Sequence, residues 1–129
     1  MKKLLSIVIA FAIAQASIAQ TKVPDVAKFS SATIDLGKVK QGEPVSAIFS
    51  ITNISQKPLV IEQASPACGC TIADYTKTPI PPGEKGIVKA TYNATGTGTF
   101  HKAITVKFAG VNETQTILLN GEVVAPNKE

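Results

Sequence analysis

The two cysteines are the residues whose type and spacing could do chemistry. They form the segment Cys68-Gly69-Cys70-Thr71, and they are all of the cysteine in the 129-residue sequence. Two thiols separated by one residue could form a tight disulfide, hold a metal ion or act as a redox switch. Which of these applies depends on the compartment and on the elements that position the pair.

A disulfide between Cys68 and Cys70 is the state that the sequence favours. An extended strand would hold their Cα atoms near or just beyond about 6.8 Å, the upper limit for a disulfide. Gly69 can adopt backbone angles that other residues avoid, and so could bring the sulfurs together. A ring this small would be strained, easier to reduce than an ordinary structural disulfide and of little value to stability. Free or partly buried thiols, metal binding and pairing between chains remain alternatives.

The N-terminus predicts export. Two lysines precede an apolar run over residues 4–14, and Ser17-Ile18-Ala19 follows ahead of Gln20. This order is typical of a secretory signal peptide cut between Ala19 and Gln20. A membrane anchor needs about 20 apolar residues, and polar residues interrupt this run. We therefore expect residues 1–19 to be removed and the protein to reach the periplasm, the cell surface or the medium, where a disulfide persists.

Charge and length narrow the class of partner. The formal net charge of +4 comes from 13 basic residues, all of them lysine, and it falls to +2 without the two lysines of the leader. Nucleic-acid binding usually shows a clustered basic patch with arginine, so we expect no nucleic-acid partner. Membrane contact is expected only through the cleaved leader. About 110 residues remain, enough for one domain.

The rest of the chain alternates between apolar and polar residues with a period of two. The alternation is clearest over residues 45–52, 88–92 and 104–108, and turn-forming residues separate such runs at short intervals. This period indicates half-buried strands of antiparallel sheets. The pattern predicts an all-β sandwich of short strands, with strands near residues 45–53, 58–64, 86–93 and 100–108.

A series of motifs then resembles a known family. The segments that carry the resemblance are Ile34-Asp35-Leu36-Gly37-Lys38-Val39, Gly42-Glu43, Phe49-Ser50-Ile51-Thr52-Asn53, Pro58-Leu59-Val60-Ile61, Ala67-Cys68-Gly69-Cys70-Thr71, Ile80-Pro81-Pro82-Gly83-Glu84 and Gly86. They are similar to a bacterial exported family described only as domain of unknown function 1573, related to the major sperm protein, PapD and ASH domains. The Cys-Gly-Cys-Thr element is its distinguishing mark. The resemblance implies an immunoglobulin-like antiparallel β-sandwich of seven or eight strands, and no biochemical activity.

Domain boundaries and core positions follow from the same patterns. We expect an N-terminal linker at 20–28, the immunoglobulin-like domain at 29–124 and a polar tail at 125–129. The predicted core residues are apolar and fall on the inward positions of the expected strands: Phe29, Leu36, Val45, Phe49, Ile51, Leu59, Ile61, Val88, Tyr92, Ile104, Val106, Ile117 and Leu119.

The expected topology places the single histidine near the cysteines. In such a sandwich the strand at 100–108 neighbours the one that ends before Cys68, and it starts at the same end. His101 would then share one pole with the two thiols, and a Cys/Cys/His set with an open position can hold zinc or copper. The alternation around His101 points it away from the core, however, and favours a solvated surface histidine over a metal ligand.

Three segments match the N-glycosylation acceptor pattern: Asn53-Ile54-Ser55, Asn93-Ala94-Thr95 and Asn112-Glu113-Thr114. Each lies in a predicted turn, where these residue types collect for backbone reasons. We interpret all three as turn residues.

No set of side chains in the sequence has the spacing of a catalytic site, and no cofactor is expected. The sequence favours an exported, non-catalytic module that binds a protein or another envelope component, through an edge strand or the loops at one pole. The alternative is a thiol-dependent role of Cys68 and Cys70 in redox exchange or metal capture.

Overall fold

The computed structural model describes residues 21–126, so the predicted leader and its cut between Ala19 and Gln20 lie outside the described residues. The elements are α1 (Val23–Val26), β1 (Ala27–Phe29), β2 (Thr33–Lys40), β3 (Val45–Asn53), β4 (Ile61–Pro66), β5 (Thr71–Tyr75), β6 (Lys85–Tyr92), β7 (Gly98–Phe108) and β8 (Thr114–Val124). No helix of this part of the chain is long and apolar enough to cross a membrane.

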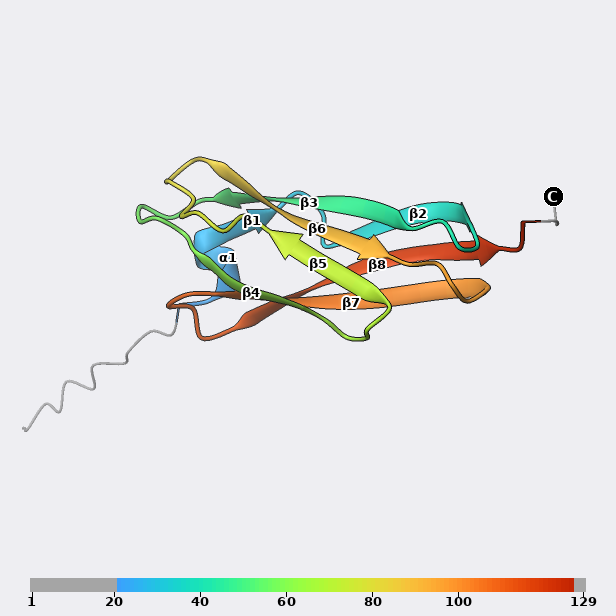
Figure 1. The fold of residues 1–129 in the computed structure, drawn as a ribbon. Helices are drawn as coiled ribbons and strands as arrows, with labels where there is room; N and C mark the ends of the chain where they lie inside the picture. The colour runs from blue at the N-terminus through green and yellow to red at the C-terminus, as the bar shows by residue number, and fades with distance from the viewer. Residues whose placement is uncertain (1–20, 127–129) are drawn as a thin grey trace, which may run out of the picture.

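The strands form two four-stranded sheets that face each other (Figure 1). The first sheet has the order β1-β3-β6-β5, and the second has the order β2-β8-β7-β4. The predicted immunoglobulin-like sandwich is therefore confirmed, with eight strands. One pair departs from the antiparallel expectation, because β2 runs parallel to β8. The cause is the connection at residues 30–32, where the chain moves from the first sheet to the second without reversing.

The strand positions follow the predicted alternation closely. β3, β6 and β7 lie within two residues of the expected ranges. The strand expected at 58–64 begins later, at Ile61, and continues to Pro66. Leu59 instead forms an isolated bridge with Ile80, because this segment first crosses to the loop before β6. The expected neighbour relation also holds, since β4 pairs with β7.

The hydrophobic core lies between the two sheets. Ten of the predicted core residues are buried, among them Phe49, Ile104 and Leu119, which are 0% exposed. Phe29, Leu36 and Val45 are only partly buried and pack against the core from its margin. The core also contains buried residues that the prediction omitted: Val23, Ala27, Val39, Ala47, Ala64, Ile80, Ala90, Ala94, Phe100, Phe108, Val111 and Val123.

The segment before Phe29 is part of the domain and not the expected linker. Val23 in α1 and Ala27 in β1 are buried, and β1 pairs with β3 from Ala27 onward. The prediction was wrong because four helical residues and a three-residue strand are too short to give a periodic signal. These two short elements stabilise the domain by burying Val23 and Ala27 against the core.

Asn53 is a buried polar residue at the end of β3. Its side-chain amide donates to the main-chain carbonyls of Lys57 and Ile80 at 2.7 and 2.8 Å. Its Oδ1 accepts from the main-chain N–H and the hydroxyl of Ser55 at 2.9 and 2.7 Å. The side chain is 0% exposed, so it ties the turn after β3 to the loop that contains Ile80. The match to the N-glycosylation pattern at Asn53-Ile54-Ser55 is therefore explained by hydrogen bonds that stabilise a turn.

We expect Asn53→Ala to lower the free energy of unfolding by about 3 kcal/mol, because it removes four hydrogen bonds of a fully buried side chain and leaves the N–H of Ser55 without its acceptor. Asn112→Ala is the matched control, since Asn112 is exposed and its replacement should change stability by less than about 0.5 kcal/mol. Urea unfolding of both variants measures the difference. Equal midpoints for the two variants would show that the Asn53 bonds contribute nothing net.

Candidate functional site

The two cysteines lie where the chain passes from one sheet to the other. β4 ends at Pro66 in the second sheet, and β5 begins at Thr71 in the first sheet. The four residues between them make this crossing. They lie at one end of the sandwich together with the turns at 41–44 and 93–97 (Figure 1). We call this end, made of the turns 41–44, 67–70 and 93–97, the cysteine pole.

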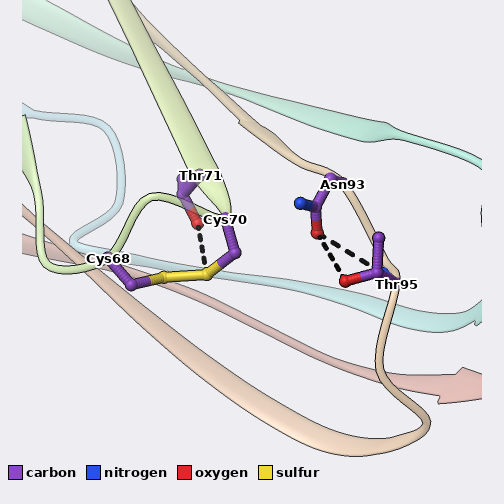
Figure 2. The surroundings of a disulfide bond; sticks show 5 residues. All are labelled: Cys68, Cys70, Thr71, Asn93 and Thr95. Atoms are coloured by element: carbon purple, nitrogen blue, oxygen red, sulfur yellow. Dashed lines mark hydrogen bonds between the residues drawn. A yellow bond between two sulfur atoms is a disulfide. The ribbon is translucent and has the colours of Figure 1, made fainter.

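In the structure Cys68 and Cys70 are joined by a disulfide, with their Cα atoms 5.4 Å apart (Figure 2). That separation lies inside the usual range of 4.4–6.8 Å and is shorter than a fully extended strand would give. The N–H of Thr71 points back to the carbonyl of Cys68 at 3.4 Å. The segment is thus a turn, and this turn brings the sulfurs together.

Main-chain hydrogen bonds fix both ends of this turn. The N–H of Ala67 donates to the carbonyl of Ala103 in β7 at 2.9 Å, and the N–H of Asn93 donates to the carbonyl of Cys70 at 3.0 Å. The disulfide therefore lies between one attachment to the second sheet and one to the end of β6 in the first. We call the disulfide a brace, because it lies between these two attachments at the crossing from one sheet to the other.

The remaining turns of the cysteine pole are tied to the same network. After Asn93 the chain reaches Ala94, a buried residue with a left-handed backbone (φ 55°), a conformation that costs a non-glycine residue about 1 kcal/mol. The carbonyl of Ala94 accepts from the N–H of Gly42 at 2.9 Å, and the side chain of Gln41 donates to Thr95 at 2.9 Å. Asn93 accepts from the N–H and hydroxyl of Thr95 (Figure 2).

The immediate surroundings of the sulfurs are weakly polar. Cys70 Sγ lies 3.9 Å from the hydroxyl of Thr71, and the Thr71 side chain is buried. Both cysteines are half-buried, whereas Gly69 between them is exposed. A reductant can therefore approach the turn from outside. A helix N-terminus can lower a thiol pKa, but the one helix among residues 21–126, α1, lies at the opposite end of the sandwich (Figure 1).

His101 does not join the cysteines in the structure, so the alternative of a Cys68/Cys70/His101 metal cluster finds no support, and His101 lies on the surface as the alternation indicated. Among the described residues no group of three or more His, Cys, Asp or Glu side chains could hold a metal ion. His101 lies on β7 near the same pole, but it is exposed and its Nδ1 lies 3.0 Å from Oδ1 of Asn120 on β8. The cause is the strand alternation, which turns its side chain to the outer face of the second sheet.

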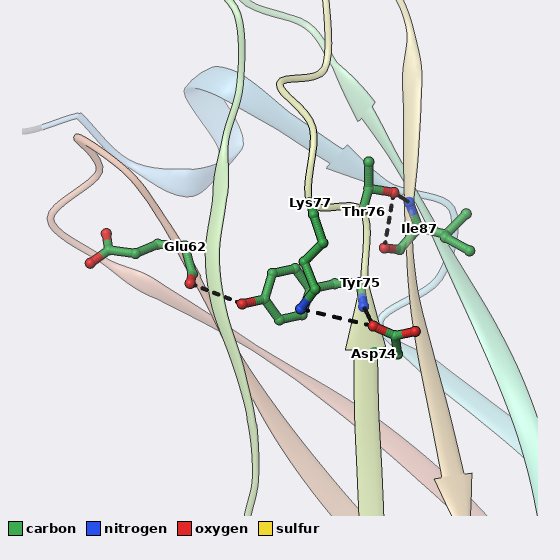
Figure 3. Close-up of polar contacts among 6 residues, drawn as sticks. All are labelled: Glu62, Asp74, Tyr75, Thr76, Lys77 and Ile87. Atoms are coloured by element: carbon green, nitrogen blue, oxygen red, sulfur yellow. Dashed lines mark hydrogen bonds and ion pairs between the residues drawn. The ribbon is translucent and has the colours of Figure 1, made fainter.

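A second connection between the sheets runs from β5 to β4 (Figure 3). The Tyr75 hydroxyl donates to the carbonyl of Glu62 at 3.1 Å. Lys77 lies over the Tyr75 ring, 3.3 Å from its centroid, and 3.9 Å from the carboxylate of Asp74. Together with the disulfide, this contact fixes β5 at both of its ends.

Most of the chain matches the model of one protein family. The model of the family described as "Protein of unknown function (DUF1573)" matches residues 27–123. The chain belongs to this family. The match begins at the first residue of β1, in agreement with the burial of Ala27. No curated protein matches the chain.

Solved structures show the same fold in proteins of different kinds. A protein of unknown function from Porphyromonas gingivalis W83 is 22% identical with a TM-score of 0.66, over 81% of this chain and 48% of that one. The chain thus spans about half the length of that protein. The seventh ASH/PapD-like domain of human CEP192 gives a TM-score of 0.63 at 14% identity, covering 84% of this chain and 93% of that domain. The VesB protease of Vibrio cholerae gives 0.61 at 17% identity, over 78% of this chain and 33% of the protease. At these identities the likeness shows the fold alone.

We expect Cys68→Ser with Cys70→Ser to leave the fold intact and to lower the free energy of unfolding by no more than about 1.5 kcal/mol, because the bond closes a very short loop. Urea unfolding of the oxidised protein, the reduced protein and the double variant measures this. The reduced protein is the matched control, since it keeps the sulfur atoms and lacks only the bond. A double variant that is unfolded without denaturant would contradict the expectation.

Proposed function

We propose that this protein is an exported, non-catalytic immunoglobulin-like module that binds a component of the cell envelope, with the Cys68–Cys70 disulfide as a brace of its fold. The observation that carries the proposal is the position of the cysteine pair. It lies between main-chain bonds to Ala103 in the second sheet and to Asn93, directly after β6 of the first sheet, and its sulfur contact is a threonine hydroxyl.

The geometry around the single histidine supports a non-catalytic role. A nucleophilic site pairs a base with a hydroxyl or thiol at hydrogen-bonding distance. The hydrogen bond of His101 among the described residues is with the amide of Asn120. The cysteines lie on the crossing between the sheets, while His101 belongs to an outer face.

Export is supported by the leader pattern over residues 1–19 and by the cysteine state. A disulfide between two half-exposed cysteines persists in an oxidising compartment such as the periplasm or the medium, and is rare in the cytosol. The two features therefore agree on the compartment, although they come from different parts of the chain.

The alternative function is thiol-dependent, and the exposure of the turn is what favours it. Gly69 is exposed and both cysteines are half-buried, so an exchange partner or a metal ion could reach the sulfurs once the bond is reduced. Two thiolates alone leave zinc two ligands short of a closed tetrahedral site. The fold supplies no third His, Cys, Asp or Glu to such a cluster among residues 21–126.

Metal titration of the reduced protein separates the two functions. If the cysteines are a brace, isothermal titration with Zn²⁺ or Cu⁺ should give no thiol-dependent site with a dissociation constant of about 1 µM or tighter. The Cys68→Ser/Cys70→Ser variant is the control, and it should give the same titration as the reduced protein. A tighter site that disappears in the double variant would replace the binding-module proposal with metal capture.

A further inference from the structure

Three of the four strongly exposed isoleucines among the described residues lie on one surface. Ile48, Ile72 and Ile87 are 53%, 69% and 40% exposed, and they come from β3, β5 and β6 of the first sheet. In each of these strands the isoleucine alternates with inward-facing core residues, so all three point to the outer face. Ile48 and Ile87 are diagonal neighbours, since Ile48 pairs with Lys89 and Ile87 pairs with Ser50.

The same face carries an excess of positive charge. We call it the lysine–isoleucine face, and it consists of the outward residues of β1, β3, β5 and β6: Lys28, Ser46, Ile48, Ser50, Thr52, Ile72, Asp74, Lys85, Ile87, Lys89 and Thr91. Its three lysines are exposed. The single acid, Asp74, has Lys77 3.9 Å away and accepts the N–H of Tyr75 (Figure 3).

The outer face of the second sheet differs in both respects. Its exposed charges are balanced, with Lys38 and Lys40 accompanied by Asp35 and Glu122, and it carries none of the strongly exposed isoleucines. One face of the sandwich is thus apolar and basic, while the opposite face is polar and mixed in sign. Exposed apolar residues that gather on one side indicate an interaction surface.

The free edge of β5 is a weaker candidate than this face. The bonds from Asn93 to Cys70 and from Thr76 to Ile87 show that the even-numbered residues of β5 direct their main-chain groups to β6. The odd-numbered residues therefore direct theirs to the free edge. Of their N–H groups, that of Thr71 faces Cys68 O and that of Tyr75 is taken by Asp74. An added strand would find few donors to pair with.

We propose that the lysine–isoleucine face binds an anionic lipid surface. The cations are all lysine, whose flexible point charges suit diffuse attraction to lipid headgroups. No outward strand position of this face holds an aromatic residue, a type enriched at protein interfaces, where lysine is depleted. One hollow borders the face at Lys28, beside α1 and β1. Ile48, Ile72 and Ile87 do not line it, so the isoleucines themselves offer no pocket to a partner's anchor side chain.

This inference rests on the proposed binding role and names what the module binds. It also departs from the expectation that membrane contact is confined to the leader. The three isoleucines come from separate strands, so they share one face only after the chain has folded. If lipid binding fails, the disulfide brace and the metal titration are unaffected, so the two proposals fail separately.

Vesicle co-sedimentation tests the proposal with protein purified from the exported fraction. Vesicles of equal parts phosphatidylglycerol and phosphatidylcholine should bind the protein, and vesicles of phosphatidylcholine alone should not. Binding should weaken between 50 and 500 mM salt, because salt screens the charges (the Debye length is roughly 10 Å at 0.1 M).

Lys85→Gln with Lys89→Gln should weaken binding about thirtyfold, at about fivefold for each lysine near the surface. Lys38→Gln with Lys40→Gln removes the same charge from the opposite sheet and should leave binding within about twofold.

A second pair of variants tests the apolar part. Ile72→Ser should weaken binding about tenfold, whereas Leu118→Ser, which changes a partly buried apolar residue at an outward position of β8 in the second sheet, should have little effect. Circular dichroism checks that every variant is folded. Equal loss in the two lysine variants, or no binding to anionic vesicles, would overturn the proposal and leave the face to an acidic protein partner.

Discussion

Burial of apolar side chains between two four-stranded sheets is the constraint on which the rest of this structure depends. Each strand gives its alternate residues to the core, where Phe49, Phe108 and Ile104 are 0% exposed. The other residues of each strand must then form two outer faces. The sheets can share one core only if the chain crosses between them, and the crossing from β4 to β5 contains the cysteines. The positions of the disulfide and of the exposed isoleucines both follow from this arrangement.

The crossing also explains why the cysteine pair is better interpreted as a brace than as a reactive site. β4 and β5 lie at the edges of their sheets, and an edge strand has only one neighbour to hold it. At one end of β5 the disulfide turn is fixed by bonds to Ala103 and Asn93. At the other end the Tyr75 hydroxyl bonds to Glu62. Two short strands at an open edge are therefore held together at both ends.

Most of the fold was predictable from the sequence, because a period of two over eight or nine residues specifies both a strand and its buried face. Phe49, Val88 and Ile104 were identified as core residues in this way and are 0% exposed. The short elements α1 and β1 were missed because three or four residues carry no period. The burial of Asn53 was missed because its partners, Lys57 and Ile80, come from separate loops.

The candidate site was predictable only in part. The spacing of Cys68 and Cys70 and the position of β7 beside β4 were evident in the sequence. The alternation around His101 also indicated its outward direction, and the structure has this side chain exposed and bonded to Asn120, away from the cysteines. The lysine–isoleucine face could not be recognised, because strand order decides which outward residues become neighbours. Ile48 and Ile87 gave the local signals, each as an apolar residue on the polar side of its strand.

Intact-mass spectrometry of the exported protein, with and without reduction and each followed by thiol alkylation, tests the central claim that this is an exported module braced by a disulfide. The predicted result is a chain that begins at Gln20, is two hydrogens lighter than its reduced form and takes up two alkyl groups only after reduction. A chain that keeps its leader would contradict export. Two thiols alkylated without reduction would contradict the brace.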